Sequence, residues 1–275
     1  MNSDLLHSVS ETIGQVPLGQ PTSVSGGCIH ACYRWGPYFI KTNDRSHEAT
    51  FKAEATCLQV IGGTGTIRTP EVITHGITTD HAYLVLEHLE LIPSGNEALL
   101  GEQLASLHQQ TADRYGFPED NFIGATPQTN PWTDDWPDFF ADHRLGHLLA
   151  RLHDRGHSFP GSERLLSHLP ELLPADPPAA LLHGDLWGGN KAFLPDGTPV
   201  LFDPACYHGH AAADLAMTTL FGGFGNRFYD TYRANSDQDD PILYEIYNLY
   251  HLLNHALLFG GSYVTQATGI IARLV

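Results

Sequence analysis

The chain has 275 residues, of which 42% are hydrophobic and 16% charged, so we expect a folded globular protein rather than a disordered one. Its formal net charge of −17 would repel nucleic acid and anionic membrane surfaces, and neither is expected as a partner. The sequence shows no secretory leader pattern and no membrane-length apolar run, and its four cysteines form no CxxC pair. Together these features predict a cytoplasmic protein with free thiols.

The first part of the chain alternates strand and helix signals. Residues 29–35 and 37–41 predict two short strands joined by a Gly-Pro turn, and these are expected to be the first ordered elements. A helix is predicted over residues 46–61, where apolar side chains recur at helical spacing. Residues 82–88 form an apolar run rich in β-formers and predict a further strand. This order predicts a small antiparallel sheet accompanied by one helix.

A break after this sheet predicts two lobes. Pro93-Ser94-Gly95 interrupts the pattern and separates an N-terminal lobe, residues 1–92, from a C-terminal lobe, residues 93–275. The elements predicted beyond the break are a helix at Leu100 to Leu107, an ordered loop over 126–138, a strand over 180–183, a hairpin of 191–194 with 199–203, and a helix over 241–259 with Ile242, Ile246, Leu249, Leu253 and Leu257 on its apolar face. We therefore expect an α+β fold with a small antiparallel β-sheet lobe and a mainly helical lobe.

The segment HGDLWGGN, residues 183–190, carries the strongest chemical signal. Phosphoryl transfer needs a carboxylate that accepts the proton of the attacking hydroxyl and oxygen ligands that hold Mg²⁺ on the nucleotide phosphates. Asp185 has the spacing of the base, Asn190 and Asp203 that of the metal ligands, and His183 occupies the position of the histidine in the HxD motif. Helix caps, turns and strand ends also use these residue types, but chance would have to produce the joint spacing. The sequence therefore predicts a protein-kinase-like fold that uses ATP and Mg²⁺. In such a fold residues 1–92 are expected to be the nucleotide-binding lobe and residues 93–275 the catalytic and substrate-binding lobe.

Lys41 and Glu54 are the predicted pair that orders the nucleotide phosphates. Lys41 ends a predicted strand, and Glu54 lies on the apolar face of the following helix, where an unpaired carboxylate would be costly. A lysine and glutamate in this arrangement present the ammonium group to the α and β phosphates of ATP. Glu48 is the competing partner but lies nearer the helix start, and two solvated surface side chains are the alternative.

Two further segments are candidates for nucleotide contact. Gly26 and Gly27 precede the first predicted strand and could let backbone amides approach phosphate, although adjacent glycines also mark ordinary turns. Glu87, His88 and Leu89 end the last strand before the break, where a two-lobed kinase offers main-chain groups to adenine. An ordinary strand end is the alternative for this second segment.

An aromatic and acidic cluster is a candidate substrate site. Trp132, Asp134, Asp135 and Trp136 would suit a hydroxylated substrate that carries a cationic amine, through carboxylates and aromatic faces. A loop packed by its own aromatic side chains is the alternative interpretation. Trp187, in the catalytic segment, is added as a candidate substrate residue.

Over nearly its whole length the chain resembles the fructosamine (ketosamine) kinase family. The segments that carry the resemblance include YFIKTN, LVLEHLEL, DNFIGATPQTNPW, LLHGDLWGGN, DPACYHGHAAADLAM and LLNHALLFG. The pattern HGD followed by Asn and a later Asp is shared with aminoglycoside and choline kinases. The segments DNFIGATPQTNPW and DPACYHGHAAADLAM resemble the ketosamine branch in particular.

The resemblance implies ATP-dependent phosphorylation of the sugar 3-hydroxyl of a ketoamine, on a small amine or on a lysine of a glycated protein, after which the product decomposes and frees the amine. It implies the same roles for the catalytic, metal, nucleotide and hinge residues as the spacing does, and it adds Asp214 as a brace of the catalytic loop. Two departures from the family pattern are visible. Gly188 stands where the family usually has serine, and Ser25 replaces the first glycine of a triplet.

Two other functions remain open at this point. An aminoglycoside- or choline-type phosphotransferase would share the catalytic loop and would also favour an acidic pocket. A nucleotide-binding pseudokinase that acts by interaction is the alternative from another class, although Lys41, Asp185, Asn190 and Asp203 are all present.

Overall fold

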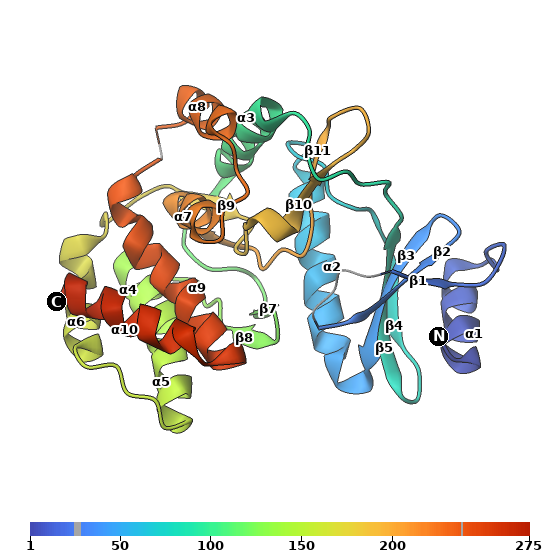
Figure 1. The fold of residues 1–275 in the computed structure, drawn as a ribbon, viewed down its shortest axis with the longest axis horizontal. Coiled ribbons are helices and arrows are strands. Elements are labelled where there is room, and N and C mark those ends of the chain that lie inside the picture. Colours follow the sequence, from blue (N-terminus) through green and yellow to red (C-terminus); the bar gives the residue numbers. More distant parts are fainter. Residues whose placement is uncertain (25–28, 238) are drawn as a thin grey trace.

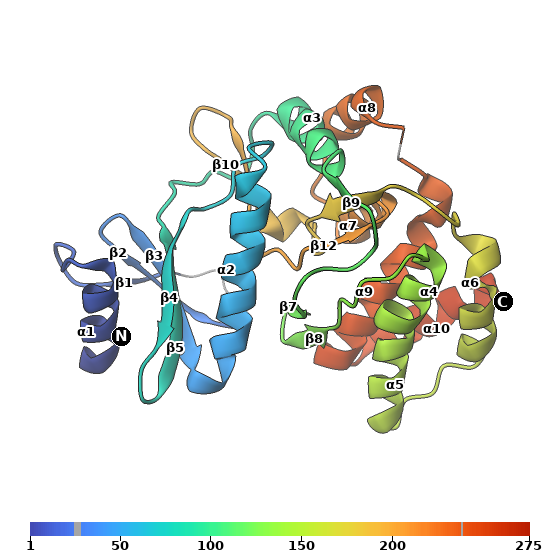
Figure 2. The ribbon, with the colours of Figure 1, turned by 180° about the vertical axis from the view of Figure 1, so that it is seen from behind.

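The computed structural model of the protein describes residues 1–24, 29–237 and 239–275. Figure 1 shows a part built around a β-sheet, formed by the beginning of the chain, beside a larger part made mainly of helices. Figure 2 shows from behind that α2 and the β10–β11 hairpin lie where the two parts meet. Within the described residues, no helix is long and apolar enough to cross a membrane.

The first part is an antiparallel sheet of five strands with a helix on each face. The strand order is β1-β2-β3-β5-β4. The strands are β1 (Thr22–Val24), β2 (Ala31–Trp35), β3 (Tyr38–Asp44), β4 (Val72–Ile77) and β5 (His81–Glu87). Helix α1 (Ser3–Ile13) covers one face, and α2 (Glu48–Gly63), which follows the short turn η1 (Arg45–His47), covers the other. The predicted strands, their Gly-Pro turn and the helix over 46–61 are all confirmed.

Alternation along β5 explains why both faces are covered. Tyr83 and Val85 pack with the α1 cluster that contains Leu5 and Val9. The side chains between them, Ala82, Leu84 and Leu86, pack instead against Phe51, Ala55 and Leu58 of α2. Because successive strand side chains point to opposite faces, an almost unbroken apolar run requires an apolar partner on each side.

The expectation that the first strands begin the ordered part was wrong. Helix α1 precedes them and is capped by the Asn2 side chain, which accepts a hydrogen bond from the Leu5 amide at 2.9 Å. Gly14 ends the helix in the left-handed conformation, with φ of 73°. Leu5 and Val9 are spaced as one helical face and are almost fully buried, which is the pattern that identifies this helix in the sequence.

The second part consists, in the described residues, of helices around three small sheets, β10-β11, β12-β9-β6 and β7-β8. Its helices are α3 (Glu97–His108), α4 (Trp136–Phe140), the π-helical turn η2 (Ala141–Gly146), α5 (His147–Asp154), α6 (Ser162–Leu172), α7 (Ala212–Leu220), α8 (Asn226–Asn235), α9 (Tyr244–Phe259) and α10 (Ser262–Leu274). Its strands are β6 (Thr111–Ala112), β7 (Asn121–Ile123), β8 (Thr126–Gln128), β9 (Ala179–Leu182), β10 (Lys191–Phe193), β11 (Pro199–Leu201) and β12 (Tyr207–Gly209). The predicted helix at Leu100 to Leu107, the strand over 180–183 and the hairpin around Pro195 are confirmed.

Two predictions in this part need correction. The segment 126–138 is not one loop, because it contains β8 and the first turn of α4. Ile242 does not lie on the buried face of the last predicted helix, since its side chain is 87% exposed. It belongs to a separate 3₁₀ turn, η4 (Pro241–Leu243), and the tighter turn changes the helical phase before α9 begins. The other four side chains of that predicted face are buried.

Candidate active site

The catalytic segment lies between two short strands that fix its ends. Strand β9 leads into residue 183, and the β10–β11 hairpin carries the chain back so that the Phe202 amide donates to the Asn190 carbonyl at 3.1 Å. The Asn190 side-chain nitrogen donates to the Asp185 carbonyl at 2.9 Å and to its carboxylate at 3.1 Å. It also approaches the carbonyl of Asp203 at 3.5 Å. The structure therefore brings Asp185, Asn190 and Asp203 together.

Asp203 has a backbone conformation that its neighbours must stabilise. Its φ is 57°, and no other non-glycine residue in the described ranges has a positive φ. This left-handed conformation is uncommon for side-chain-bearing residues and is often found where geometry serves a function. It places the Asp203 carboxylate in contact with the ammonium of Lys41, on the other part of the molecule.

A buried carboxylate holds the start of the catalytic segment. Asp214, from α7, accepts hydrogen bonds from the amides of His183 at 2.6 Å and Gly184 at 2.8 Å. His108 of α3 lies with Nε2 3.2 Å from the same carboxylate, and its Nδ1 is 2.8 Å from the Tyr232 hydroxyl. Burial alone would raise the pKa of Asp214, but the hydrogen bond and charge of His108 lower it overall. The sequence suggested Asp214 but not His108 or Tyr232, which only the tertiary structure brings to it.

His183 links the two ends of the segment. Its Nε2 donates to the Phe202 carbonyl at 3.1 Å, and its Nδ1 accepts from the Asp185 amide at 3.3 Å. Burial lowers the pKa of His183, so the ring is neutral at neutral pH. With one nitrogen donating and the other accepting, the ring orients the backbone beside Asp185 and takes no proton itself.

The predicted Lys41–Glu54 pair is formed. The Lys41 ammonium lies 2.6 Å from a carboxylate oxygen of Glu54, and both side chains are close to fully buried. Burial lowers the pKa of Lys41, but the carboxylates of Asp203 and Glu54 raise it overall, so the ammonium is charged. Of the three lysines, Lys191 is instead buried against Glu97, and Lys52 is half-exposed. Glu48, the competing partner, lies at the start of α2.

The pKa values of Asp185 and Asp203 are shifted in opposite directions. Burial, with the nearby negative charge of Asp203 as the second cause, raises the pKa of Asp185 to about 7. Burial also acts to raise the pKa of Asp203, but the Lys41 ammonium lowers it overall. When the pKa values of two carboxyl groups are separated in this way, one group can accept a proton while the other stays ionised and binds a cation. Asp185 suits the first role and Asp203 the second.

These residues line one cleft of about 780 Å³ between the two parts of the molecule. Its walls carry most of the predicted site residues: Lys41, Glu54, Glu87, His88, Leu89, Asp185, Trp187, Asn190 and Asp203. Gly26, Gly27 and Cys28 lie outside the described residues, but Val24 and Ile29, which flank them, both line the cleft.

Most polar groups of the predicted hinge, residues 87–89, already have hydrogen-bond partners within the protein. The His88 amide donates to the Pro37 carbonyl at 2.7 Å. The Glu87 carboxylate accepts from the Glu71 amide at 2.7 Å and contacts the Arg68 guanidinium. In the described part of the chain the Leu89 amide has no hydrogen-bond acceptor, so it is the main-chain donor left at this strand end. Arg68, which sequence reasoning missed, fixes the Glu87 side chain.

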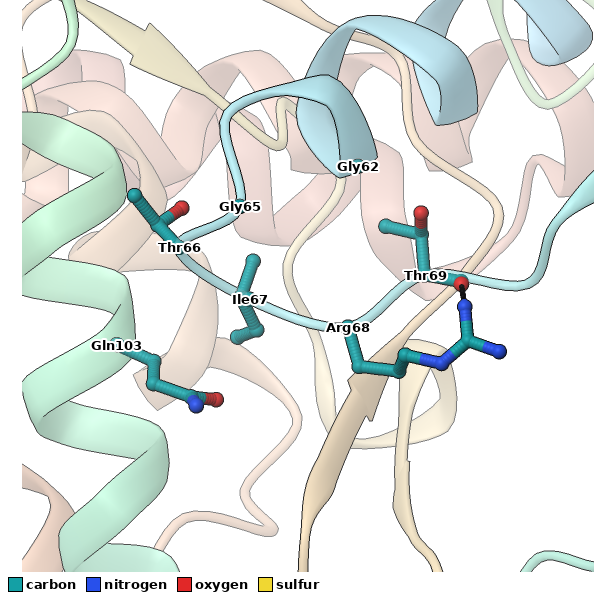
Figure 3. Close-up of a pocket in the computed structure, with 7 residues that line it drawn as sticks. All are labelled: Gly62, Gly65, Thr66, Ile67, Arg68, Thr69 and Gln103. Carbon is teal, nitrogen blue, oxygen red and sulfur yellow. Dashed lines mark hydrogen bonds between the residues drawn. The ribbon is translucent and has the colours of Figure 1, made fainter.

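Arg68 also borders a second, smaller pocket of about 280 Å³ (Figure 3). Its lining consists of Gly62, Gly65, Thr66, Ile67, Arg68, Thr69 and Gln103. Figure 3 shows the Arg68 side chain turned along its own loop, where the guanidinium bonds the Thr69 carbonyl. None of the catalytic side chains lines this pocket.

Comparison with known proteins identifies the family. Residues 1–275 match the family model described as fructosamine kinase. A probable ketoamine kinase of Synechocystis sp. is 44% identical over 280 residues, which cover 98% of this chain and 95% of that protein. The chain belongs to the fructosamine kinase family. The resemblance inferred from its motifs is confirmed.

Other members and structural relatives agree with this assignment. A chloroplastic protein-ribulosamine 3-kinase of Oryza sativa is 39% identical over 264 residues, which cover 91% of this chain and 77% of that protein. A crystal structure from Haemophilus somnus assigned as a fructosamine-3-kinase superposes with a TM-score of 0.91 at 27% identity, over 99% of this chain and 97% of that one. Choline kinase LicA of Streptococcus pneumoniae, at 16% identity and a TM-score of 0.63 over 99% of both chains, shares the fold. The predicted kinase-like α+β fold is confirmed.

The family motif DNFIGATPQTN proves to be a buried amide network beside the catalytic residues. Asn121 donates to the Cys206 carbonyl at 2.7 Å, and Gln128 donates to the Ala205 carbonyl at 3.1 Å. Gln128 and Asn130 both donate to the Asn121 side-chain oxygen, at 2.8 and 3.0 Å. Buried amides with this many partners fix one backbone path. In this fructosamine kinase family member the motif therefore holds the segment that follows Asp203.

The predicted substrate cluster is not brought to the cleft. Trp132, Asp134 and Asp135 are absent from its lining. The Asp135 side chain caps α4 by accepting from the Asp138 amide at 2.7 Å, and Asp134 is exposed near Arg114. The neighbouring Trp136 is fully buried, so the alternative of a loop packed by its own aromatic side chains describes it correctly. Of the predicted substrate residues, only Trp187 lines the cleft.

The departure at position 188 has a structural reason in this chain. A Cβ atom added to Gly188 would lie 2.8 Å from the Gly222 carbonyl oxygen and 3.2 Å from the Gly223 Cα. Because both neighbours are backbone atoms, a side chain at this position would force the catalytic loop and the turn after α7 apart. The glycine therefore permits close backbone packing.

Asn190 and Asp203 fit a Mg²⁺ ion better than a metal that prefers histidine or cysteine. No group of three or more His, Cys, Asp or Glu side chains in the described ranges is placed to hold a metal. One amide and one carboxylate are hard oxygen ligands of the kind used when nucleotide phosphates and water complete the coordination of Mg²⁺. Since the Asn190 nitrogen already donates to Asp185, its side-chain oxygen is the atom available to a cation.

Proposed function

We propose that the protein is an ATP- and Mg²⁺-dependent ketoamine 3-kinase. Membership of the fructosamine kinase family makes it an ATP-dependent phosphotransferase that acts on a hydroxyl group. The observation that carries the proposal is the convergence of Lys41, Asp185, Asn190 and Asp203 on one cleft. Kinases need four such groups in one place: a cation that binds phosphate, a base and two metal ligands.

The chain's own groups account for the transfer step. Asp185, with its raised pKa, accepts the proton of the attacking hydroxyl as the hydroxyl oxygen bonds to the terminal phosphorus. The bond from that phosphorus to the β-phosphate oxygen breaks in the same step, and ADP leaves. Lys41, kept charged by its carboxylate partners, orients the α and β phosphates of ATP. Mg²⁺, held through Asn190 and Asp203, would supply neutralisation of the phosphate charge. The Asn190 hydrogen bond to the Asp185 carboxylate fixes the direction in which the base faces.

We propose that the two parts of the molecule divide these tasks as lobes. Residues 1–92 would bind the nucleotide through the Lys41–Glu54 pair and the strand end at residues 87–89. Residues 93–275 would carry the catalytic loop and the acceptor side of the cleft. We also propose a cytoplasmic location, with which the free thiols of Cys32, Cys57 and Cys206 agree.

The proposed acceptor is a sugar ketoamine, attached to a small amine or to the lysine side chain of a glycated protein. Relatives named ketoamine kinase and protein-ribulosamine 3-kinase, at 44% and 39% identity, support this choice. The likeness to choline kinase, at 16% identity, concerns the fold alone.

The proposal is tested by ATP consumption with fructosamines, ribulosamines, aminoglycosides and choline as acceptors. We expect turnover with the ketoamines, and Asp185→Ala should lower kcat by about 10²-fold or more because the base is lost. Asp134→Ala, at a side chain that is 88% exposed and outside the cleft, is the matched control and should retain activity. Preference for choline or an aminoglycoside, or equal turnover in the Asp185 variant, would contradict the proposal. Absence of any turnover in the wild type would favour a pseudokinase.

A further inference from the structure

A run of aromatic side chains leads away from the catalytic segment across the surface. The ring of Trp187 lies 6.1 Å from that of Phe221, which lies 4.8 Å from the ring of His255, centroid to centroid. His255 then contacts Phe259 at 5.6 Å and Tyr263 at 5.1 Å. Trp187 and Phe221 are 38% and 39% exposed, and Phe259 is 63% exposed. These five side chains are called the aromatic run.

The aromatic run begins in the cleft itself. Trp187 lines the cleft together with Asp185, two residues before it in the chain. Phe221 ends α7, and the turn that follows packs against the catalytic loop, because the Gly188 and Gly222 backbones leave no room for a side chain between them. The first two rings are therefore held beside each other and beside the base by close backbone contact.

The far end of the aromatic run lies where α9 meets α10. Gly260 and Gly261 connect these helices with φ values of 65° and 61°, a conformation that favours glycine. This turn brings Phe259 and Tyr263 together beside His255, with their ring centroids 6.4 Å apart, and the His255 Nδ1 donates to the His251 carbonyl at 2.8 Å. The end of the run is therefore a cluster of three adjoining rings, in which Phe259 is 63% exposed.

The chemistry of a ketoamine determines where its carrier must leave the site. In a ketoamine, three covalent bonds separate the C3 carbon, whose hydroxyl reacts, from the amine nitrogen. When that hydroxyl is beside Asp185, the nitrogen therefore lies in the same cleft, which Trp187 also lines. The amine is cationic, and aromatic faces attract cations. The group attached to the amine then continues over the neighbouring surface.

We propose that the aromatic run binds the polypeptide that carries the ketoamine, with an apolar side chain next to the modified lysine packed on Phe259 and Tyr263. This inference rests on the proposed ketoamine kinase function and names the form of its substrate. A free sugar amine is too small to cover rings three contacts away from Trp187 in the cleft, whereas a peptide backbone extends that far. Exposed contiguous apolar surface marks an interaction site. The net charge of −17 favours a lysine-rich partner.

The test compares one ketoamine in three settings: on a single blocked lysine, in a heptapeptide with Leu and Phe beside the modified lysine, and in the same heptapeptide with Ser at those positions. The wild type should show a kcat/KM about tenfold higher for the apolar peptide than for the Ser peptide. Phe259→Ala should remove this preference by raising KM, with kcat and the single-lysine reaction unchanged. Ile242→Ala, at an 87% exposed apolar side chain just before the same helix, should behave as the wild type.

The outcomes separate the aromatic run from the proposed function. The inference is overturned if Phe259→Ala keeps the apolar preference, if the wild type has none, or if Ile242→Ala loses it equally. If the wild type phosphorylates no ketoamine, the proposed function fails, and the surface is judged by fluorescence anisotropy with the labelled apolar ketoamine peptide. Weaker binding to Phe259→Ala than to the wild type would then support the surface, and equal binding would overturn it.

Discussion

At the scale of single residues, the site places a carboxylate where its charge is unfavourable. Burial and the charge of Asp203 raise the pKa of Asp185 to about 7, against an ordinary value of 3.8. The folded state therefore holds a proton that the unfolded state releases, and between these two values the folded state loses stability as the pH rises. The same raised pKa makes Asp185 a base that can accept a proton near neutral pH.

Replacing Asp185 with Asn should consequently stabilise the protein while it abolishes turnover. In the absence of nucleotide and metal, we expect the free energy of unfolding at pH 8 to rise by about 2 kcal/mol, less than the full pKa shift implies because the carboxylate is not wholly buried. The gain should shrink as the pH falls and disappear below about pH 3, where the wild-type carboxyl is protonated in both states. Urea unfolding at several pH values measures this, with Asp134→Asn as the exposed control. A gain that is independent of pH would contradict the account.

At the scale of elements, α3 and the two consecutive helices α7 and α8, which lie far from α3 in the sequence, support the catalytic segment. Tyr232 of α8 contacts His108 of α3, His108 contacts Asp214 of α7, and Asp214 accepts the amides at the start of the loop. An Asn at position 214 would offer one good acceptor to three donors, which leaves buried groups unpaired. The nucleotide pair Lys41–Glu54 belongs to other elements and is not part of this support.

Asp214→Asn should therefore affect the chemical step more than nucleotide binding. We expect kcat to fall roughly 10- to 100-fold, the KM for ATP to stay within about twofold, and the free energy of unfolding to fall by about 1–3 kcal/mol. Steady-state kinetics and thermal unfolding of the same preparation measure all three quantities. An unchanged kcat, or a rise in KM for ATP as large as the fall in kcat, would show that the carboxylate does not position the loop.

The sequence predicted those elements and site residues whose signal is local. The hairpin of β10 and β11, the spacing of Asp185 and Asn190, and Lys41 at a strand end are patterns within a short stretch of chain. What it did not predict depends on long-range contacts or on helical phase. The role of the Asn121 and Gln128 amides requires knowledge that residues 205 and 206 lie against them. The exposure of Ile242 depends on a 3₁₀ turn that periodicity does not distinguish from the α-helix beside it.

The structure leaves the predicted substrate cluster outside the cleft, which the local sequence could not show for a related reason. Trp, Asp, Asp and Trp at residues 132 to 136 have the same composition whether they form a pocket or a helix start. The decisive facts are the Asp135 cap on α4 and the burial of Trp136, whose indole nitrogen donates to the Tyr247 hydroxyl at 3.0 Å. Tyr247 is far away in the sequence, so no local pattern carries this contact.

At the scale of the whole molecule, an ion pair in the cleft and a backbone hydrogen bond join the two parts of the described chain. Lys41 of β3 contacts Asp203, which follows β11. The backbone carbonyl of Arg68 accepts a hydrogen bond from the Leu201 amide of β11 at 2.9 Å, and the Arg68 side chain pairs with Glu87 at the predicted hinge. The proposed nucleotide side and the proposed acceptor side of the cleft are thereby held in one arrangement. Phosphoryl transfer depends on this positioning, because the protein supplies little covalent chemistry of its own.

The central claim, that these groups together transfer the terminal phosphate of ATP to the 3-hydroxyl of a ketoamine, is tested most directly by ³¹P NMR of the reaction. With the wild-type protein, Mg²⁺, ATP and a fructosamine, the account predicts one phosphate ester on the C3 oxygen for each ADP formed. Release of inorganic phosphate without an ester, or an ester on another oxygen, would contradict it.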